Sequence, residues 1–180
     1  IKINQKNLSK NNIFIFGIKP TTPSSEFGYF LTKKIKGNIN KVTRFIEKPK
    51  KIKAIQIIKN NGYWNSGMFF LTKDSIIDNF KKYQPSIFKY CKKAVIKSKY
   101  RSNIYYLNKK SFNRTTAKSF DYAILEKCKN INAIKLDIPW SDLGSWKEIC
   151  KMYGRNKKKY FKKKNIFYRP WGSYVNLFNG

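Results

Sequence analysis

The sequence predicts an α/β domain in which a mixed sheet is flanked by helices, and two observations lead to this. Short apolar runs typical of strands alternate along the chain with segments that carry helix-capping residues. The first run, 13–18, is continuously apolar and is closed by Lys19-Pro20, which is typical of a strand buried on both faces. Strands that alternate with helices are the pattern of layered α/β folds.

The elements between 21 and 71 are delimited by their breaker residues. Pro49 ends a strand because proline cannot donate to a ladder. Asn65-Ser66-Gly67 places a polar kink inside a strand that is otherwise aromatic and apolar. In order, we expect a loop (21–27), a strand from Gly28, a polar turn (33–40), a strand (42–49), a short helix (54–59) and a buried strand (63–71).

Capping residues define the later helices. Ser75, with Asp78 three positions on, resembles a capping box, and Pro85 suits the first turn of a helix. The segment 99–116 carries no clear pattern and is expected to be irregular. In order, the sequence predicts helices from 75 to 83, 85 to 98 and 119 to 127, a strand from 131 to 138, and a helix from Ser145 that Gly154 ends.

Composition excludes several classes of protein. The 180 residues carry 40 Lys and Arg against 9 Asp and Glu, a net charge of +31. With 41% hydrophobic residues, the chain is too apolar for a disordered polycation. Histidine is absent, which excludes imidazole catalysis and histidine-ligated zinc. Since no apolar run approaches the roughly 20 residues of a membrane span, we expect a cytoplasmic protein without a membrane partner.

The basic charge raises the question of a nucleic-acid partner. The lysines are spread along the chain among Ile and Asn, so broad compositional drift is the favoured interpretation and nucleic-acid binding the less favoured one. The carboxylates are more informative, because each of the few present is a candidate for a function that lysine cannot perform. Five of the nine fall within one 28-residue stretch: Asp121, Glu126, Asp137, Asp142 and Glu148.

Asp142 follows a predicted strand and precedes a helix start at Ser145. Carboxylates at the carboxyl ends of strands in open α/β sheets lie where ligands bind, and such a group can hold Mg²⁺ shared with a phosphate. The alternative is that Asp142 caps a turn and Gly144 supplies the bend. Spacing alone favours the alternative.

Glu47, Lys48, Asn65 and Gly28 are the further candidates. Glu47 could accept hydrogen bonds from sugar hydroxyls and Lys48 could meet a phosphate, although neighbours on a strand point to opposite faces unless a twist or bulge turns them. An exposed charge pair is the alternative. Asn65 must satisfy its amide, through a bound polyol or through an internal turn, and Gly28 is either a ligand-facing position or an ordinary strand glycine.

Five segments, in this order, resemble bacterial mannose-1-phosphate guanylyltransferases, especially the form fused to a mannose-6-phosphate isomerase. They begin at Phe16 (FGIKPT), Phe45 (FIEKP), Tyr63 (YWNSGMF), Ser119 (SFDYA) and Trp140 (WSDLGSW). Arg169-Pro170-Trp171-Gly172-Ser173-Tyr174 resembles the opening of the fused isomerase. The resemblance covers nearly everything from Ile13 onward and implies an incomplete, Rossmann-like nucleotidyltransferase fold.

The resemblance also implies an activity. The phosphate of mannose 1-phosphate would attack the α-phosphorus of GTP, giving GDP-mannose and pyrophosphate, with Mg²⁺ as cofactor. Position by position, Asp142 would be the catalytic Mg²⁺ ligand, Lys48 would contact the phosphate, and Glu47, Asn65 and the Gly28 backbone would contact the sugar. Asp121 also matches a family position, with its role either at the ligand or in its helix.

The chain departs from the family in several places. The glycine-rich loop, the first metal-binding aspartate and the guanine-reading strands have no counterpart, and Ser24-Ser25-Glu26-Phe27 replaces a Glu-Thr-Gly-Tyr-like step. The resemblance thus implies a sugar-phosphate-binding part over 1–154, a basic linker over 155–168, and the start of a cupin-like isomerase module over 169–180.

A part of an enzyme has consequences for its activity and its sheet. We expect this chain to be inactive unless a separate chain supplies the N-terminal half, and we expect its sheet to expose apolar edges. The alternatives are a decayed remnant without catalysis and a basic module that binds nucleic acid or another polyanion.

Overall fold

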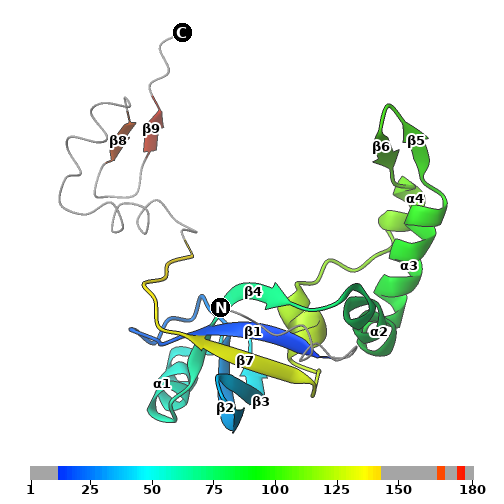
Figure 1. Ribbon diagram of the computed structural model, residues 1–180. Coiled ribbons are helices and arrows are strands. Elements are labelled where there is room, and N and C mark those ends of the chain that lie inside the picture. Colours follow the sequence, from blue (N-terminus) through cyan, green and yellow to red (C-terminus); the bar gives the residue numbers. More distant parts are fainter. Residues whose placement is uncertain (1–11, 143–165, 169–173, 177–180) are drawn as a thin grey trace. The chain divides into compact units, whose positions relative to one another are not determined.

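The computed structural model describes residues 12–142, 166–168 and 174–176 (Figure 1). The chain divides into two compact units, Ile1–Ile138 and Pro139–Gly180. In the second unit, β8 (Ile166–Tyr168) pairs antiparallel with β9 (Tyr174–Asn176). The predicted helix from Ser145 and most of the predicted linker lie outside the described residues, and the domain boundaries proposed above stay predictions.

The first unit is built on five strands that form a mixed sheet, as the sequence predicts. Their order is β1-β4-β2-β3-β7, and β7 pairs with β1 again, so the sheet closes on itself. Only the β1–β7 pairing is parallel. The strands are β1 (Ile13–Ile18), β2 (Tyr29–Lys36), β3 (Ile39–Ile46), β4 (Tyr63–Phe70) and β7 (Ile131–Leu136).

Closure of the sheet removes the apolar edges that the sequence led us to expect. Each of the five strands pairs with two neighbours, and the last gap is closed where β3 pairs with β7 through Ile39 and Ile134. Register shifts within the β2–β3 pairing mark irregularities of the kind that bend and twist a sheet. The expectation of exposed edges within these strands is therefore wrong.

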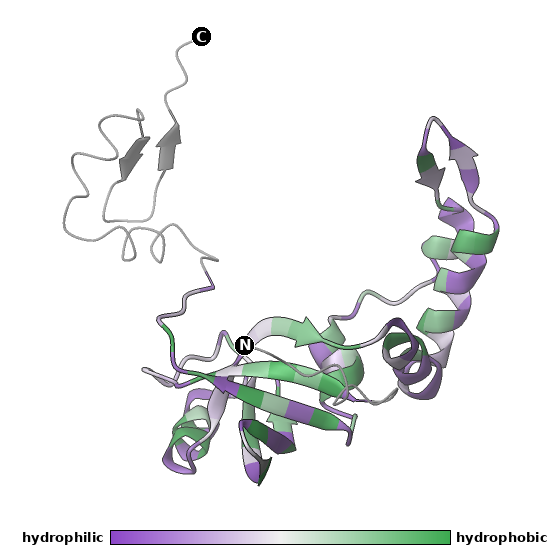
Figure 2. Ribbon diagram, in the orientation of Figure 1, coloured by the Kyte–Doolittle hydropathy of each residue, from purple (hydrophilic) through white to green (hydrophobic). Residues whose placement is uncertain are grey.

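The core lies between this sheet and the turn that follows residue 120. Ile13, Phe14 and Ile15 are at most 1% exposed, and since successive residues of a strand point to opposite faces, this confirms a first strand buried on both faces. Hydrophobic residues run along β1 in Figure 2. Ala123, Ile124 and Leu125 fill the same core from η2 (Asp121–Leu125), a single π-helical turn that stands where the sequence predicts a longer helix.

The β2–β3 connection corrects the predicted polar turn over 33–40. Both strands continue through the lysine-rich segment, and only Gly37 and Asn38 form the turn. Gly37 has φ +55°, the left-handed conformation that tight hairpins require. Lys33 and Lys34 lie on exposed positions of a paired strand, and their polarity led to the wrong prediction.

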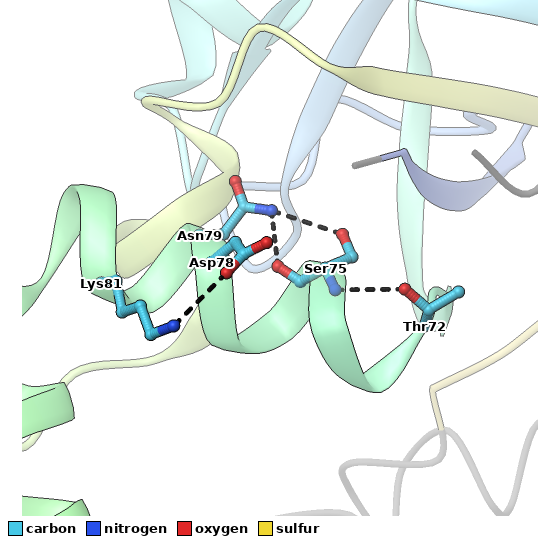
Figure 3. Close-up of polar contacts among 5 residues, drawn as sticks. All are labelled: Thr72, Ser75, Asp78, Asn79 and Lys81. Carbon is cyan, nitrogen blue, oxygen red and sulfur yellow. Dashed lines mark hydrogen bonds and ion pairs between the residues drawn. The ribbon is translucent and has the colours of Figure 1, made fainter. Parts of the chain in front are cut away.

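The helix α1 (Lys51–Lys59) follows β3, and α2 (Lys73–Tyr83) follows β4. Thr72 caps α2, because its Oγ1 accepts a hydrogen bond of 3.1 Å from the Ser75 N–H (Figure 3). The predicted cap at Ser75 is therefore wrong. Ser75 is buried in the first turn, where its carbonyl accepts from Asn79 Nδ2, and Asp78 pairs with Lys81.

The segment after Pro85 contains more structure than predicted. The helix α3 (Pro85–Ile96) begins at the proline as expected. The segment predicted to be irregular forms a hairpin of β5 (Lys99–Arg101) and β6 (Ile104–Tyr106), followed by α4 (Lys109–Phe112). Ser102 and Asn103 turn this hairpin with positive φ and without glycine, so the usual sequence signal is missing.

Among the helices in the described ranges, none combines the length and the apolar character that crossing a membrane requires.

Candidate functional site

A polar cluster lies where the β2, β3 and β4 segments meet the π-helical turn. Gly28 immediately precedes β2, Glu47 immediately follows β3, Asn65 belongs to β4, and Asp121 opens η2. The fold thus brings three of the predicted site residues, Gly28, Glu47 and Asn65, to one place. It adds Asp121, whose role the sequence left open.

Gly28 is required by close packing within this cluster. Its carbonyl accepts a hydrogen bond of 2.7 Å from the Asn65 N–H. A Cβ at Gly28 would collide with Glu47 Oε2, and it would lie 3.0 Å from Phe45 Cζ and 3.4 Å from Asn65 Cβ. The lack of a side chain at Gly28 therefore leaves room for the Glu47 carboxyl group, and a role of Gly28 towards a ligand stays a prediction.

Asn65 is held by two contacts. Its Nδ2 donates to Asp121 Oδ1 at 2.9 Å, and its Oδ1 accepts from the Gly67 N–H at 3.3 Å. Gly67 has φ +76°, and the pairing of β4 with β1 shifts register around it, so the predicted polar kink is an irregularity within a continuous strand. Since an amide NH₂ group carries two hydrogens, one bond to Asp121 leaves Nδ2 with a second donor.

Glu47 and Lys48 do not continue the alternation of β3. Lys48 has φ +45°, a left-handed conformation that turns the chain just after the strand. The Glu47 N–H donates to Glu126 Oε1 at 3.0 Å, across 79 residues of sequence. The positive charge of Lys48 acts on the carboxyl groups of both Glu47 and Asp121, where it opposes the rise in their pKa.

The electrostatics of the cluster favour a neutral carboxyl group. Glu47 Oε2 is buried and has no hydrogen-bond partner among the described residues. Burial first, and then the nearby Asp121 and Glu126, raise the pKa of Glu47 to about 7, with Lys48 opposing them. Burial also raises the pKa of Asp121, against the hydrogen bond from Asn65. The cluster therefore offers a carboxyl group that titrates near neutrality and has an unused oxygen.

Glu126 is a member of the cluster that sequence reasoning did not single out as a site residue. The signal that could have identified it is the scarcity of acids in this chain, because it lies in the stretch where five of the nine are gathered. Its contact with the Glu47 backbone depends on packing between η2 and the end of β3. No local pattern encodes such packing.

Asp142 belongs to the second unit and is exposed. Its predicted place beside Glu47 and Asn65 therefore stays a prediction. Within the described residues, no group of three or more acidic or cysteine side chains could hold a metal ion. Protein ligands alone thus do not build a magnesium site in this part of the chain.

Comparison with known proteins gives a consistent picture. Residues 2–158 match the family described as nucleotidyl transferase. The chain is 33% identical over 147 residues to a mannose-1-phosphate guanylyltransferase of Escherichia coli, a match that covers 78% of this chain and 32% of that protein. A mannose-1-phosphate guanylyltransferase of Sinorhizobium fredii is 34% identical over 150 residues, covering 82% and 29%. The chain thus spans about a third of the length of these curated relatives.

Two solved structures resemble the fold. A structure titled mannose-1-phosphate geranyltransferase, from Thermus thermophilus, has a TM-score of 0.70 at 21% identity and covers 83% of this chain and 42% of that one. A structure titled mannose-6-phosphate isomerase, from Helicobacter pylori, has a TM-score of 0.62 at 33% identity and covers 73% and 52%. Both matches support the fold described above.

Proposed function

Because this chain belongs to the nucleotidyl transferase family, we propose that it is the sugar-phosphate-binding part of a mannose-1-phosphate guanylyltransferase. In that reaction a phosphate oxygen of mannose 1-phosphate bonds to the α-phosphorus of GTP. The bond from that phosphorus to the β-phosphate oxygen breaks, pyrophosphate leaves, and GDP-mannose forms. Such transfers depend mainly on positioning and on neutralising charge.

The observation that carries this proposal is that Glu47 Oε2 is buried and accepts no hydrogen bond from the part of the chain that the structure describes. A buried polar atom without a partner is costly, and a sugar hydroxyl that donates to it would remove that cost. The second Nδ2 hydrogen of Asn65 can donate to a sugar oxygen at the same place. Gly28 leaves the Glu47 carboxyl group in position because a glycine has no Cβ to occupy the space that the carboxyl group fills.

Lys48 is the residue proposed to meet the phosphate of the sugar. Its side chain is exposed, and its backbone turns at the edge of the carboxyl cluster. A lysine ammonium binds phosphate as a point charge and needs no fixed plane. The two residues therefore contact different parts of the ligand: the ammonium group of Lys48 contacts the phosphate, and the carboxyl group of Glu47 contacts the sugar hydroxyls.

Magnesium and GTP complete the proposal. A single carboxylate, Asp142, cannot hold Mg²⁺ by itself, so phosphate oxygens would have to supply further ligands. The chain has no segment like the family's glycine-rich loop, and we propose that it binds the sugar phosphate without turnover on its own.

The test is calorimetric titration of the chain with mannose 1-phosphate, mannose and glycerol 1-phosphate. We expect Glu47→Gln to weaken binding of both mannose ligands about tenfold, because a buried hydrogen bond to a carboxylate is lost. Lys48→Gln should weaken the binding of mannose 1-phosphate and leave the affinity for mannose unchanged. The control is Asp78→Asn, which changes an exposed carboxyl group on α2.

Two outcomes would overturn the proposal. Equal affinity for mannose 1-phosphate and glycerol 1-phosphate would show attraction to phosphate alone. Wild-type affinity for mannose 1-phosphate in Glu47→Gln would remove Glu47 from the site. A separate assay with GTP, Mg²⁺ and mannose 1-phosphate should give no pyrophosphate, and GDP-mannose formed by this chain alone would contradict the proposed lack of turnover.

A further inference from the structure

A cavity that is separate from the Glu47 cluster lies between α3 and α4. Its volume is about 350 Å³, and four of its lining residues are cationic: Lys93, Lys97, Lys110 and Arg114. Figure 1 shows α3 and α4 packed beside each other, below the β5–β6 hairpin. No residue of the Glu47 cluster lines this cavity, and the proposed function does not use it.

The helices α3 and α4 approach each other closely at Ala94. Ala94 of α3 is fully buried, and its carbonyl accepts a hydrogen bond of 3.1 Å from the Asn108 N–H. Asn108 then caps α4, because its Oδ1 accepts from the Ser111 N–H at 2.9 Å. Close approach at Ala94 leaves the long side chains on either side of the contact to surround a hollow.

The spacing of the cations follows from the helical repeat. Lys93 lies in the last turn of α3, and Lys97, four residues on, is the residue that caps the end of that helix, so both lie near the same side of it. Lys110 lies in α4, and Arg114 follows it four residues later. Charges from both segments therefore converge on a single cavity.

Arg114 is held in a defined orientation. Its guanidinium carbon lies 4.7 Å from the centre of the Tyr90 ring, and Tyr90 also lines the cavity. Such stacking fixes the guanidinium plane, whose N–H groups match the oxygens of a phosphate in pairs. A guanidinium that is oriented in this way differs from a freely moving surface lysine.

The positive charge of the cavity is not compensated within the described part of the chain. No aspartate or glutamate occurs between Asp78 and Asp121, and none of the four cations forms an ion pair there. Like charges brought together repel one another, and a bound anion would relieve that repulsion. Three of the nine carboxylates, Glu47, Asp121 and Glu126, lie at the Glu47 cluster instead.

We propose that the cavity between α3 and α4 binds a phosphate group of a multiply charged compound. Its volume lies within the range of small-ligand sites, and it offers one oriented guanidinium, three ammonium groups and the Asn108 amide. Phosphate is the anion that suits this set, because its oxygens accept paired bonds from arginine and single contacts from lysine. The group can belong to a free oligophosphate or to a lipid headgroup.

The experiment measures binding of the full chain to inorganic tripolyphosphate at near-physiological salt. We expect one saturable site. The double variant Lys93→Gln/Lys97→Gln should weaken it about tenfold or more, since charge-assisted bonds are lost. Arg114→Lys, which keeps the charge, should still weaken it several-fold because the stacked fork is lost.

The control removes the same charge from a different helix. Lys51→Gln/Lys59→Gln alters two exposed lysines of α1 and should leave tripolyphosphate affinity unchanged. A second arm measures sedimentation with vesicles of phosphatidylcholine, with and without phosphatidic acid. Pocket-dependent binding to the acidic vesicles alone identifies a lipid source, and binding to tripolyphosphate alone identifies a free compound.

Two results would overturn the inference. Equal loss of affinity in the α3 and α1 double variants would show that only the overall charge attracts phosphate. Absence of saturable binding in both arms would show that the cavity holds no phosphate group. Either result leaves the mannose 1-phosphate titrations at Glu47 unaffected, because the two sites share no residue.

Discussion

Glu47 combines two features that single residues seldom share. Its backbone N–H is bonded to Glu126, while its own Oε2 is buried without a partner among the described residues. Burial and the neighbouring Asp121 and Glu126 raise the pKa of this carboxyl group to about 7. The residue is therefore sensitive to pH and to any ligand that donates a hydrogen bond.

The raised pKa gives stability a defined pH dependence. The unfolded chain ionises Glu47 near pH 4.5, whereas the folded chain holds its proton up to about pH 7. The contribution to stability is thus complete below pH 4.5 and is lost as the pH rises towards 7. Solvent screening reduces the effect, and we expect a loss of about 1 kcal/mol between pH 5 and pH 8.

Urea unfolding at a series of pH values measures this loss. Glu47→Gln should flatten the dependence over this window, because the variant has no proton to release. The control Asp78→Asn should keep the slope of the wild type. If the free energy of unfolding still falls with pH in Glu47→Gln, another group causes the dependence. Asp121 would then be the first residue to replace, because its pKa is also raised.

Gly28→Ala tests the packing of the cluster. The new Cβ would collide with Glu47 Oε2 and press on Phe45, so we expect destabilisation of about 1–3 kcal/mol and loss of mannose 1-phosphate binding. Gly37→Ala is the matched control, since it strains a left-handed turn that has open space around it. It should lower the unfolding temperature but preserve ligand affinity. Retained binding in Gly28→Ala would contradict the proposed geometry.

At the scale of elements, the π-helical turn η2 links the site to the helices. Its buried residues pack in the core, Asp121 at its start bonds Asn65, and the carbonyl of Ala123 accepts from Gln84 Nε2 at 2.8 Å. Gln84 stands at the junction of α2 and α3. One hydrogen bond thus joins that junction to the turn that carries Asp121.

Gln84→Ala should remove this link. We expect a loss of about 1 kcal/mol in stability, because the Ala123 carbonyl loses its side-chain partner, together with weaker mannose 1-phosphate binding. Chemical denaturation and calorimetric titration measure the two effects. Gln56→Ala on α1, where the side chain is exposed, is the control and should change neither. Unchanged stability in Gln84→Ala would show that the bond makes no net contribution.

At the scale of the whole molecule, the charge distribution is uneven. The net charge is +31, yet three of the few carboxylates, Glu47, Asp121 and Glu126, influence one another at a single site. A strongly charged chain repels itself in the compact state, and salt screens that repulsion. The composition therefore has a consequence for stability that no single contact explains.

We expect the unfolding temperature to rise when sodium chloride is increased from low concentration to about 0.5 M, where the Debye length falls below the ~8 Å of physiological salt. Thermal unfolding followed by circular dichroism measures the change. Sucrose, which has no charge, provides the comparison for effects of excluded solutes. A fall in the unfolding temperature with salt would show that attractive pairs outweigh the repulsion.

Much of the fold follows from local patterns in the sequence. The apolar run over 13–18, the proline that opens α3 and the strand near 131 need no distant partner to be recognised. The lysine-rich second half of β2 and the hairpin of β5 and β6 were missed, because their polar residues are typical of loops and their strands depend on pairing. Thr72, and not Ser75, is the N-cap residue of α2. Its Oγ1 accepts a hydrogen bond from the Ser75 N–H, and the sequence alone does not show which of two nearby hydroxyl groups is placed to do so.

Local patterns were sufficient to predict the mixed α/β fold and to identify Gly28, Glu47 and Asn65 as candidates, and the family resemblance implied that they share a sugar site. Their meeting at one place is a property of the folded chain. Only the tertiary structure decided that the sheet closes and that Asp121 and Glu126 complete the cluster. Strand neighbours and contacts across 56 or 79 residues depend on where the chain returns in space. The burial that raises the pKa of Glu47 arises from that same return, since desolvation is a property of the packed environment and not of the residue.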